Sequence, residues 1–237
     1  MSVEIRSVAR LIEYVERRCK HETYLFRGQR EDKPLVPKIG RGRPNWKIPH
    51  WERRMFEDFK RRSTPYLEGD PPSTDWHWLA IAQHHGMGTR LLDWSDNPLA
   101  ALWFAVEKAP LPNRNGELGH GVVWVFRVFE HEVVTDIEAE DPFDGQRTQV
   151  FQPPHIARTI VAQGGWFTVH KYIEKQPGFI ALEKNKLYKK RLNRLIIPPE
   201  AFSNLKEELE KCGVNAVSMF PNMTGLCDYL NSKWLPT

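Results

Sequence analysis

The sequence predicts an α+β fold in a single domain, with helices clustered early and a mixed sheet formed largely by later strands. Apolar residues recur at helical spacing through the first hundred positions, and short apolar runs typical of strands dominate afterwards. With 237 residues, 41% of them hydrophobic, the chain is long enough to bury one sizeable core. We therefore expect an N-terminal helix within 1–22 and a sheet-containing core over 23–237.

The expected helices are defined by apolar spacing together with capping and stop signals. Three of them cover 8–19, 199–212 and 224–230. A further helix carries an apolar stripe of Trp51, Met55 and Phe59 and stops at Thr64-Pro65. Another is capped by Ser73 or Thr74 and ends at Gly86, and the last starts at Asn97-Pro98.

The expected strands are short apolar runs bounded by polar or turn residues. They cover 24–28, 89–94, 122–129, 166–170, 192–197 and 216–220. The run VVWVFRVF at 122–129 is long and almost wholly apolar, which predicts a position inside the sheet rather than at its edge.

The composition excludes several classes of protein. No run approaches the roughly 20 apolar residues of a membrane helix, and the N-terminus MSVEIRSVAR lacks the apolar stretch of a signal peptide. We therefore expect a cytoplasmic protein with no membrane partner. The cysteines Cys19, Cys212 and Cys227 are odd in number and have no metal-ligand spacing, so we expect them to be reduced and mostly buried.

Charge is distributed unevenly along the chain. The segment 27–62 holds 12 Lys/Arg and 5 Asp/Glu, and 184–194 holds six basic residues and no acid. The segment 130–144 holds seven acids and no Lys or Arg. Two interpretations remain open: opposed surface potentials that steer an anionic partner, or solvated faces that partly neutralise one another.

The densest polar cluster lies in AQHHGMGTRLLDWSDNPLAALWFA, residues 82–105, where a strand runs into a capped helix. Such rims commonly bind ligands. The histidines His84 and His85 also suit a helix C-terminus, and Asp93 also suits a buried carboxylate paired with Arg90 or with backbone amides. Arg90 and Asp93 are three apart in the expected strand, so we expect them to face opposite ways and bind different elements.

A second cluster lies in ARTIVAQGGWFTVH, residues 157–170. Gln163 followed by Gly164-Gly165 places an amide, which both donates and accepts hydrogen bonds, beside backbone that another group can approach closely. A polar turn before a strand is the other interpretation. The absence of GxSxG gives serine-hydrolase chemistry little support.

Four stretches together resemble one family. FRG at 26–28, QHHGMGTRLLDWSDNPLAALWFAV at 83–106, RTIVAQGGWF at 158–167 and FPNMTGL at 220–226 are similar to the FRG domain. Because these stretches extend over nearly the whole chain, the resemblance implies one FRG-like domain over 1–237. The order of strands and helices also resembles, more distantly, the ADP-ribosyltransferases, which implies their split sheet.

The second resemblance implies a site for NAD as substrate, with no metal. Arg27 would bind the phosphates, Asp93 would lie near the second strand, and Gln163 would stand where those enzymes carry a late catalytic Glu. Glu174 and Glu183 are alternative acids, because Gln163 carries no charge. The further NAD-binding candidates are Gly28, His84, His85, Thr89 and Trp94, the last as a surface for nicotinamide.

The implied activity is transfer of ADP-ribose from NAD by a toxin or antiviral defence effector that a neutralising antitoxin protein restrains. The basic segments suggest RNA or DNA as the macromolecular acceptor, since Lys and Arg neutralise phosphates without needing sequence. The expected contacts are Lys189, Lys190, Arg191 and Arg194. A non-catalytic nucleotide or nucleic-acid binding module is the alternative, and another enzyme class remains open.

Overall fold

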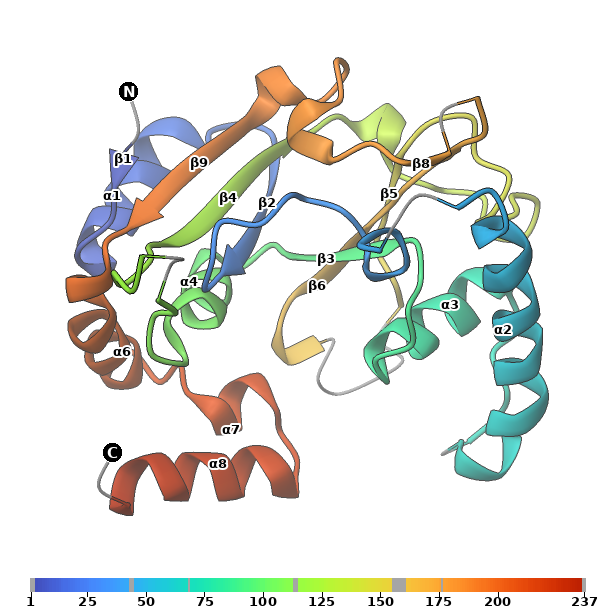
Figure 1. Ribbon diagram of the computed structural model, residues 1–237. Coiled ribbons are helices and arrows are strands. Elements are labelled where there is room, and N and C mark those ends of the chain that lie inside the picture. Colours follow the sequence, from blue (N-terminus) through green and yellow to red (C-terminus); the bar gives the residue numbers. More distant parts are fainter. Residues whose placement is uncertain are drawn as a thin grey trace.

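The computed structural model describes residues 3–42, 45–67, 69–112, 115–154, 161–175 and 177–235. Within these residues, seven strands form one mixed sheet in the order β1-β9-β4-β2-β3-β6-β5 (Figure 1). Only the β1–β9 pairing is parallel in this described sheet. The strands are β1 (Val3–Glu4), β2 (Thr23–Gln29), β3 (Leu91–Ser95), β4 (Gly121–Val128), β5 (Gln149–Phe151), β6 (Gly165–Val169) and β9 (Leu192–Ile197), and a separate hairpin pairs β7 (Tyr172–Ile173) with β8 (Gly178–Phe179).

The helices confirm the α+β class. They are α1 (Val8–Arg18), α2 (Ile48–Ser63), α3 (Asp75–His84), α4 (Pro98–Val106), α6 (Phe202–Lys211), α7 (Ala216–Met219) and α8 (Met223–Trp234). Thr74 caps α3 and Asn97 caps α4 through their side chains. Gly86 ends α3 with φ +82°, and the amide of Met87 donates to Ala82 O at 2.9 Å, as in a Schellman motif.

One core lies between the sheet and helices α1, α4 and α6. Phe26, Val123 and Val125 face these helices from β2 and β4. The close approach of α4 requires Gly28, because an added Cβ there would lie 1.7 Å from Ala101 O. The glycine of the FRG sequence therefore packs a helix on the strand, a role that we did not expect from the sequence, and it also lines the cleft described below.

The helices α2 and α3 cover the same face of the sheet over the strands β3, β6 and β5. Phe26 pairs with Ser95, so Leu91 on β3 points to the face that Phe26 occupies. There Leu91 packs with Phe56 of α2 and Trp76 of α3. On the opposite face, Leu25, Leu92, Trp94, Phe126, Leu182 and Tyr188 belong to a further core.

The sheet opens between β2 and β3, and this opening positions the site. The ladder between β2 and β4 has seven registered pairs, from Thr23 to Gln29, whereas β2 and β3 register at one pair, Phe26 with Ser95. Gly28 would face Asp93 if the second ladder continued. Arg27 lies at this opening.

The predicted apolar stripe of α2 is confirmed at Phe59, which packs against the core, but it is wrong at Trp51 and Met55. Trp51 is 47% exposed and Met55 is 37% exposed, whereas Glu52 and Phe56 face inward. The burial of Glu52 explains the shift, because this carboxylate pairs with Arg90 from a segment 38 residues away. The inward face of α2 therefore consists of Glu52, Phe56 and Phe59, of which the predicted stripe included only Phe59.

Residues 216–220 were predicted to form a strand, and this is also wrong. Asn215 accepts hydrogen bonds from the amides of Val217 and Ser218 and so starts the short helix α7. The following helix α8 is longer than expected, because it runs from Met223 to Trp234.

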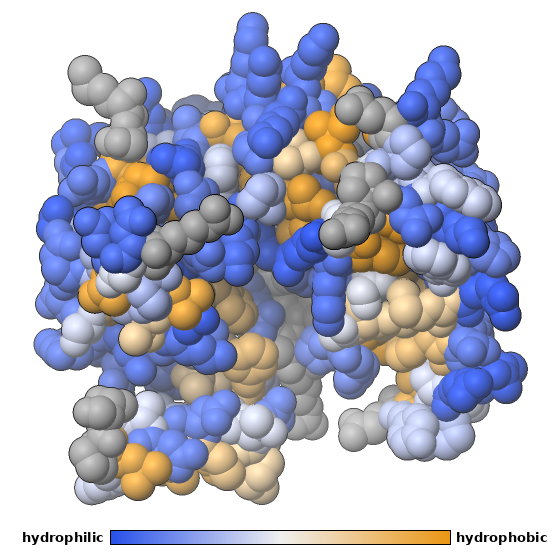
Figure 2. All heavy atoms as spheres, viewed as in Figure 1, coloured by the Kyte–Doolittle hydropathy of each residue, from blue (hydrophilic) through white to orange (hydrophobic). Residues whose placement is uncertain are grey.

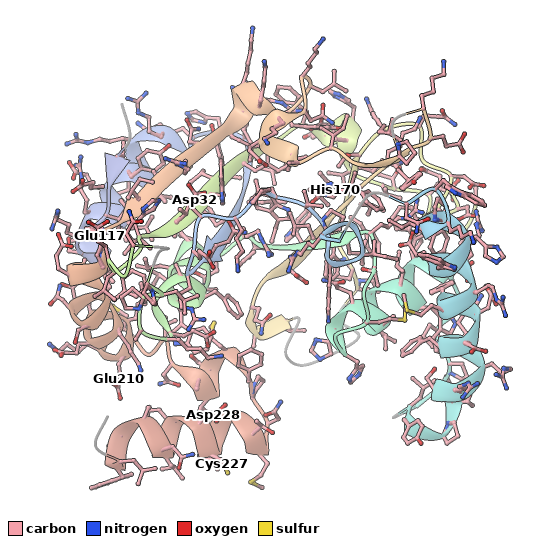
Figure 3. All side chains as sticks on the ribbon, in the orientation of Figure 1. Asp32, Glu117, His170, Glu210, Cys227 and Asp228 are labelled. Carbon is pink, nitrogen blue, oxygen red and sulfur yellow. The ribbon has the colours of Figure 1, made fainter. Side chains whose placement is uncertain are left out.

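The cysteines are free, as expected, but mostly not buried. Cys212 and Cys227 are exposed, the latter on α8 at the lower edge of the molecule (Figure 3). Cys19 is half-buried, and burial raises the pKa of its thiol to about 11. Among the helices that the structure describes, none has the length and apolar character needed to cross a membrane.

Candidate functional site

A cleft of about 1080 Å³ adjoins the opening between β2 and β3. Its walls come from β2 and the loop that follows it, the end of α3, the strand β3, the helix α4 and the residue after α7. Figure 2 shows a hollow between the left and right halves of the molecule. The lining includes Arg27, His84, Asp93, Phe104, Gln163 and Phe220. Arg27, Asp93 and Gln163, which are distant in the sequence, therefore converge on one cavity.

Arg27 lines the cleft, and most of its guanidinium N–H donors have no hydrogen-bond partner among the described residues. Its Nη1 donates to the backbone oxygen of Asp93 at 2.6 Å and lies 3.6 Å from Asp93 Oδ2. Its Nε is buried and has no hydrogen-bond partner among the described residues. Burial lowers the pKa of Arg27, and the Asp93 carboxylate opposes that shift. An arginine nevertheless stays protonated at neutral pH.

Asp93 stands at the rim with its carboxylate oriented by α3. Gln83 Nε2 donates to both carboxylate oxygens at 3.1 Å. Thr89 Oγ1 in turn donates to Gln83 Oε1 at 2.6 Å, which fixes the orientation of the amide. Thr89 is fully buried and does not line the cleft, so it orients Gln83 rather than contacting a ligand. The Asp93 side chain is 56% exposed and remains accessible.

The two histidines lie in different environments. His84 lines the cleft, whereas His85 is exposed and does not. Burial lowers the pKa of His84, the neighbouring His85 adds to that effect, and Asp93 opposes it. His84 is therefore neutral at pH 7 and offers one donor and one acceptor.

Gln163 reaches the cleft, but its amide is engaged elsewhere. Its Nε2 donates to Met219 O at 3.1 Å. Gly164, with φ +55°, is needed because an added Cβ would lie 2.1 Å from Asp96 Oδ1. The group that approaches this backbone closely is thus the protein's own Asp96, which receives a hydrogen bond from Trp166 Nε1. Residues 157–160 of the same sequence cluster lie outside the described residues.

Three further candidates differ in their position relative to the cleft. Trp94 lines the cleft, but it is only 4% exposed and donates from Nε1 to Thr168 Oγ1 at 3.0 Å, so most of its ring packs in the core. Glu183 accepts from the amide of Leu35 at 3.1 Å and does not line the cleft. Glu174 is exposed outside the lining. Among the described lining residues, the carboxylates are those of Asp93 and Glu31.

His170, which the sequence did not single out, lies buried just beyond β6 (Figure 3). Its Nε2 is 3.0 Å from Thr168 Oγ1, and its Nδ1 has no hydrogen-bond partner among the described residues. Burial lowers the pKa of His170 to about 3, and the charge of Arg27 adds to the shift. No local motif marks this residue, because its proximity to Arg27 arises from the tertiary fold.

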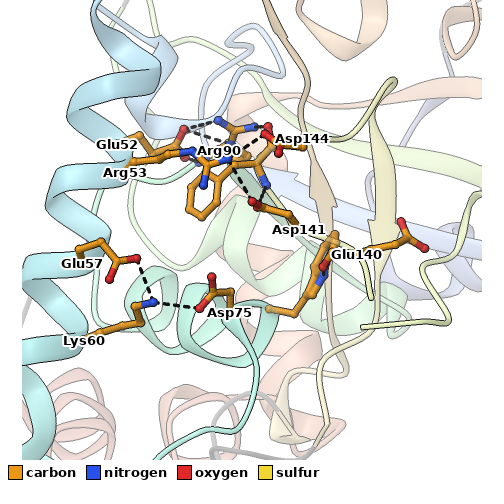
Figure 4. Close-up of polar contacts among 11 residues, drawn as sticks. Glu52, Arg53, Glu57, Lys60, Asp75, Arg90, Glu140, Asp141 and Asp144 are labelled. Atoms are coloured by element: carbon orange, nitrogen blue, oxygen red, sulfur yellow. Dashed lines mark hydrogen bonds and ion pairs between the residues drawn. The ribbon is translucent and has the colours of Figure 1, made fainter. Parts of the chain in front are cut away.

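Arg90 has a different role from Asp93, as predicted. Its Nε and Nη2 donate to Glu52 Oε2 at 3.0 and 2.7 Å, and its backbone amide donates to Oε1 at 2.8 Å (Figure 4). Its Nη1 donates to Phe143 O at 2.8 Å. This buried pair fastens α2 to the start of β3.

The predicted nucleic-acid contacts divide into two groups. Arg191 is buried and bonds to both carboxylate oxygens of Glu132 at 2.6 and 2.7 Å, so it is not available to a phosphate. Arg194 forms an ion pair with Asp32. Lys189 and Lys190 are exposed.

The basic segment 27–62 and the acidic segment 130–144 meet in the fold. Arg53 of α2 contacts Asp141 at 3.0 Å and Asp144 at 2.7 Å (Figure 4). Part of the charge segregation in the sequence is therefore neutralised inside the molecule, as the second interpretation of these charges expected.

Comparison with known proteins supports one family. Residues 22–114 match the family model of the FRG domain, which confirms that resemblance over the segment containing Arg27 and Asp93. Gln163 and Phe220 lie outside the matched segment, so the extension of the domain over 1–237 stays a prediction. No curated protein and no solved structure matches the chain.

Proposed function

We propose that this chain, which carries an FRG domain at residues 22–114, binds NAD in the cleft and transfers ADP-ribose to a macromolecule. The observation that carries the proposal is the convergence of Arg27, His84 and Asp93 on one cavity of about 1080 Å³. That volume is slightly above the range of about 300–1,000 Å³ that is typical of ligand pockets. A guanidinium and a carboxylate at one rim suit a substrate that is anionic at its phosphates and becomes cationic at its reacting ribose.

Arg27 is the group proposed to bind the pyrophosphate. A planar fork of N–H donors matches two phosphate oxygens, and a charge-assisted bond of this kind is stronger than a neutral one. The backbone oxygen of Asp93 holds Nη1 and so aims the guanidinium. Arg30 and Arg41 line the same cleft and add positive charge.

Asp93 is the group proposed to act at the ribose. In the transfer, the bond between ribosyl C1 and nicotinamide nitrogen breaks, and its electron pair neutralises the pyridinium. A nucleophile of the acceptor forms the new bond to C1 and loses its proton to solvent. Positive charge develops on the ribosyl ring in the transition state, and a preoriented carboxylate stabilises it. The two hydrogen bonds from Gln83 provide that orientation.

The acceptor and the cellular role rest on the resemblance to ADP-ribosyltransferases. We propose a toxin or defence effector acting on RNA, DNA or protein, with a neutralising protein partner. Lys189 and Lys190 provide exposed positive charge for a nucleic acid acceptor. A nucleotide-binding module without transfer is the alternative, and it is an outcome of the experiment below.

The experiment uses NAD labelled separately in its adenylate and nicotinamide parts, incubated with the full chain and a pool of RNA, DNA and protein. Wild type should release nicotinamide and attach the adenylate label to one component of the pool. Asp93→Asn should bind NAD normally but transfer about a hundredfold more slowly, the typical cost of losing a preorganised electrostatic contact. Asp58→Asn, the same change on exposed α2, is the matched control.

The other outcomes separate the alternatives. Release of nicotinamide with no labelled acceptor would indicate NAD hydrolysis. Binding of NAD without release would support the binding module. An unchanged transfer rate in Asp93→Asn would remove Asp93 from the site, and absence of NAD binding by folded wild type would overturn the proposal.

A further inference from the structure

Two aromatic rings form a corner at one end of the cleft. Phe104 lies on α4 and Phe220 directly follows α7, and both are partly exposed and line the cavity. Their ring centroids are 6.1 Å apart, and the rings stand at 86° to one another. We call this pair the aromatic corner.

The aromatic corner has a rigid support. Trp103, which is 6% exposed, packs with its ring centroid 5.2 Å from that of Phe104 and 5.9 Å from that of Phe220. These contacts are also edge-on, and they join the corner to the core beneath α4. The rings therefore keep their relative orientation with little freedom to close over the cavity.

Two contacts from other segments hold Phe220 in place. Gln163 Nε2 donates to the carbonyl oxygen of Met219, the residue before Phe220. Gly225 lets α8 lie against the end of α7, because an added Cβ would be 2.0 Å from Phe220 O. The stretches QGGWF and FPNMTGL, which the proposed transfer does not use, thus meet at this corner.

We infer that the aromatic corner binds the base ring of a nucleotide and that Gln163 is its positioning residue. This inference deepens the proposed function and rests on the cleft being a nucleotide site. A planar base fits the corner that two rings at a right angle form, because it stacks on the face of one ring and turns its own edge to the face of the other. The cationic side chains of Arg27 and Arg30 in the same cavity favour a ring that carries phosphate.

Isothermal titration with AMP and with ribose 5-phosphate isolates the contribution of the base. Wild type should bind AMP more tightly than ribose 5-phosphate. Phe220→Leu keeps an apolar side chain but removes the ring, so AMP binding should weaken by roughly five- to a hundredfold, as for lost base stacking. Binding of ribose 5-phosphate should not change. Tyr66→Leu, at an 85% exposed aromatic residue that does not line the cleft, is the control.

The positioning role is tested with the same pair of ligands. Gln163→Ala should weaken AMP binding and leave ribose 5-phosphate binding unchanged. Gln163→Glu has nearly the same shape but loses the amide donor to Met219 O, so it should behave like Gln163→Ala. A merely structural role would weaken both ligands in proportion to the loss of folded protein.

The outcomes distinguish this inference from the proposed transfer. If wild type binds AMP and Phe220→Leu binds it equally well, the aromatic corner is overturned while the nucleotide cleft stands. If the AMP preference depends on Phe220 but no label moves from NAD, the corner stands and the transferase fails. Equal binding of AMP and ribose 5-phosphate by wild type, or binding of neither, overturns the inference.

Discussion

Two largely enclosed arginines of this molecule, one on β2 and one just before the neighbouring strand β3, have opposite surroundings. Arg90, just before β3, directs Nε and Nη2 to Glu52 and Nη1 to Phe143 O. Among the described residues, Arg27 on β2 donates one hydrogen bond, to the backbone oxygen of Asp93, and the nearest carboxylate oxygen is 3.6 Å away. The guanidinium of Arg90 therefore has protein acceptors for its hydrogen bonds. The guanidinium of Arg27 keeps N–H donors that a ligand can use.

The difference shows that burial alone does not identify a functional arginine. A buried charge is stabilised only when it is paired and its hydrogen bonds are made. Arg191, with two bonds to Glu132, follows the pattern of Arg90. Arg27 departs from it and does so in the cleft, which supports a role in binding rather than in stability.

The largest expected effect is on stability at the Arg90 pair. Glu52→Gln removes the charge that Arg90 faces, and a buried charge left unpaired costs about 3–5 kcal/mol. Denaturant titration should show this loss in the free energy of unfolding, whereas NAD affinity of the molecules that remain folded should not change. The double variant Glu52→Leu with Arg90→Met should recover only part of the stability, because it removes both charges but leaves the buried Arg90 amide without its acceptor. A loss below about 1 kcal/mol for Glu52→Gln would show that Arg90 depends on its protein partners no more than Arg27 does, which would contradict the comparison.

A smaller effect concerns His170. Burial and the charge of Arg27 together lower the pKa of this histidine to about 3. The unfolded chain, with a histidine pKa near 6.5, takes up this proton first as the pH falls. The stability that neutral His170 contributes above about pH 6.5 is therefore lost progressively down to about pH 3, by roughly 2 kcal/mol at pH 5. His170→Gln should remove this part of the pH dependence.

The measurement for His170 is the free energy of unfolding of wild type and variant at pH 7 and pH 5. Burial also lowers the pKa values of His77 and His84. Their contributions to the pH dependence are the same in both proteins and cancel when the two unfolding free energies are subtracted. Parallel profiles for the two proteins would mean that His170 is not held neutral beside Arg27.

Local signals predicted much of the fold. The cap at Asn97, the stop at Gly86 and the strand 192–197 agree with the structure because each depends on residues adjacent in sequence. The face of α2 was missed because Glu52 is drawn inward by a partner distant in the sequence. The strands β1, β5, β7 and β8 are two or three residues long and carry no periodic pattern.

The candidate site was predictable in part. The resemblance to known families pointed to Arg27, Asp93 and Gln163, and all three line the cleft. The hydrogen bonds that separate their roles were not predictable, because Gln163 is engaged by Met219 across 56 residues. Proximity of this kind follows from the sheet topology and from helix packing, and short-range patterns do not encode it.

The central claim is that Arg27 is held ready for a ligand, and Arg27→Ala tests it with the smallest expected cost in stability. Loss of the hydrogen bond to Asp93 O should lower the free energy of unfolding by about 1 kcal/mol. Isothermal titration should show NAD binding roughly ten- to a hundredfold weaker, as expected for a lost charge-assisted contact. Arg27→Lys should not restore it, because an ammonium lacks the planar fork. Unchanged NAD affinity, with a stability loss as large as that of Glu52→Gln, would contradict the claim and make Arg27 a structural residue like Arg90.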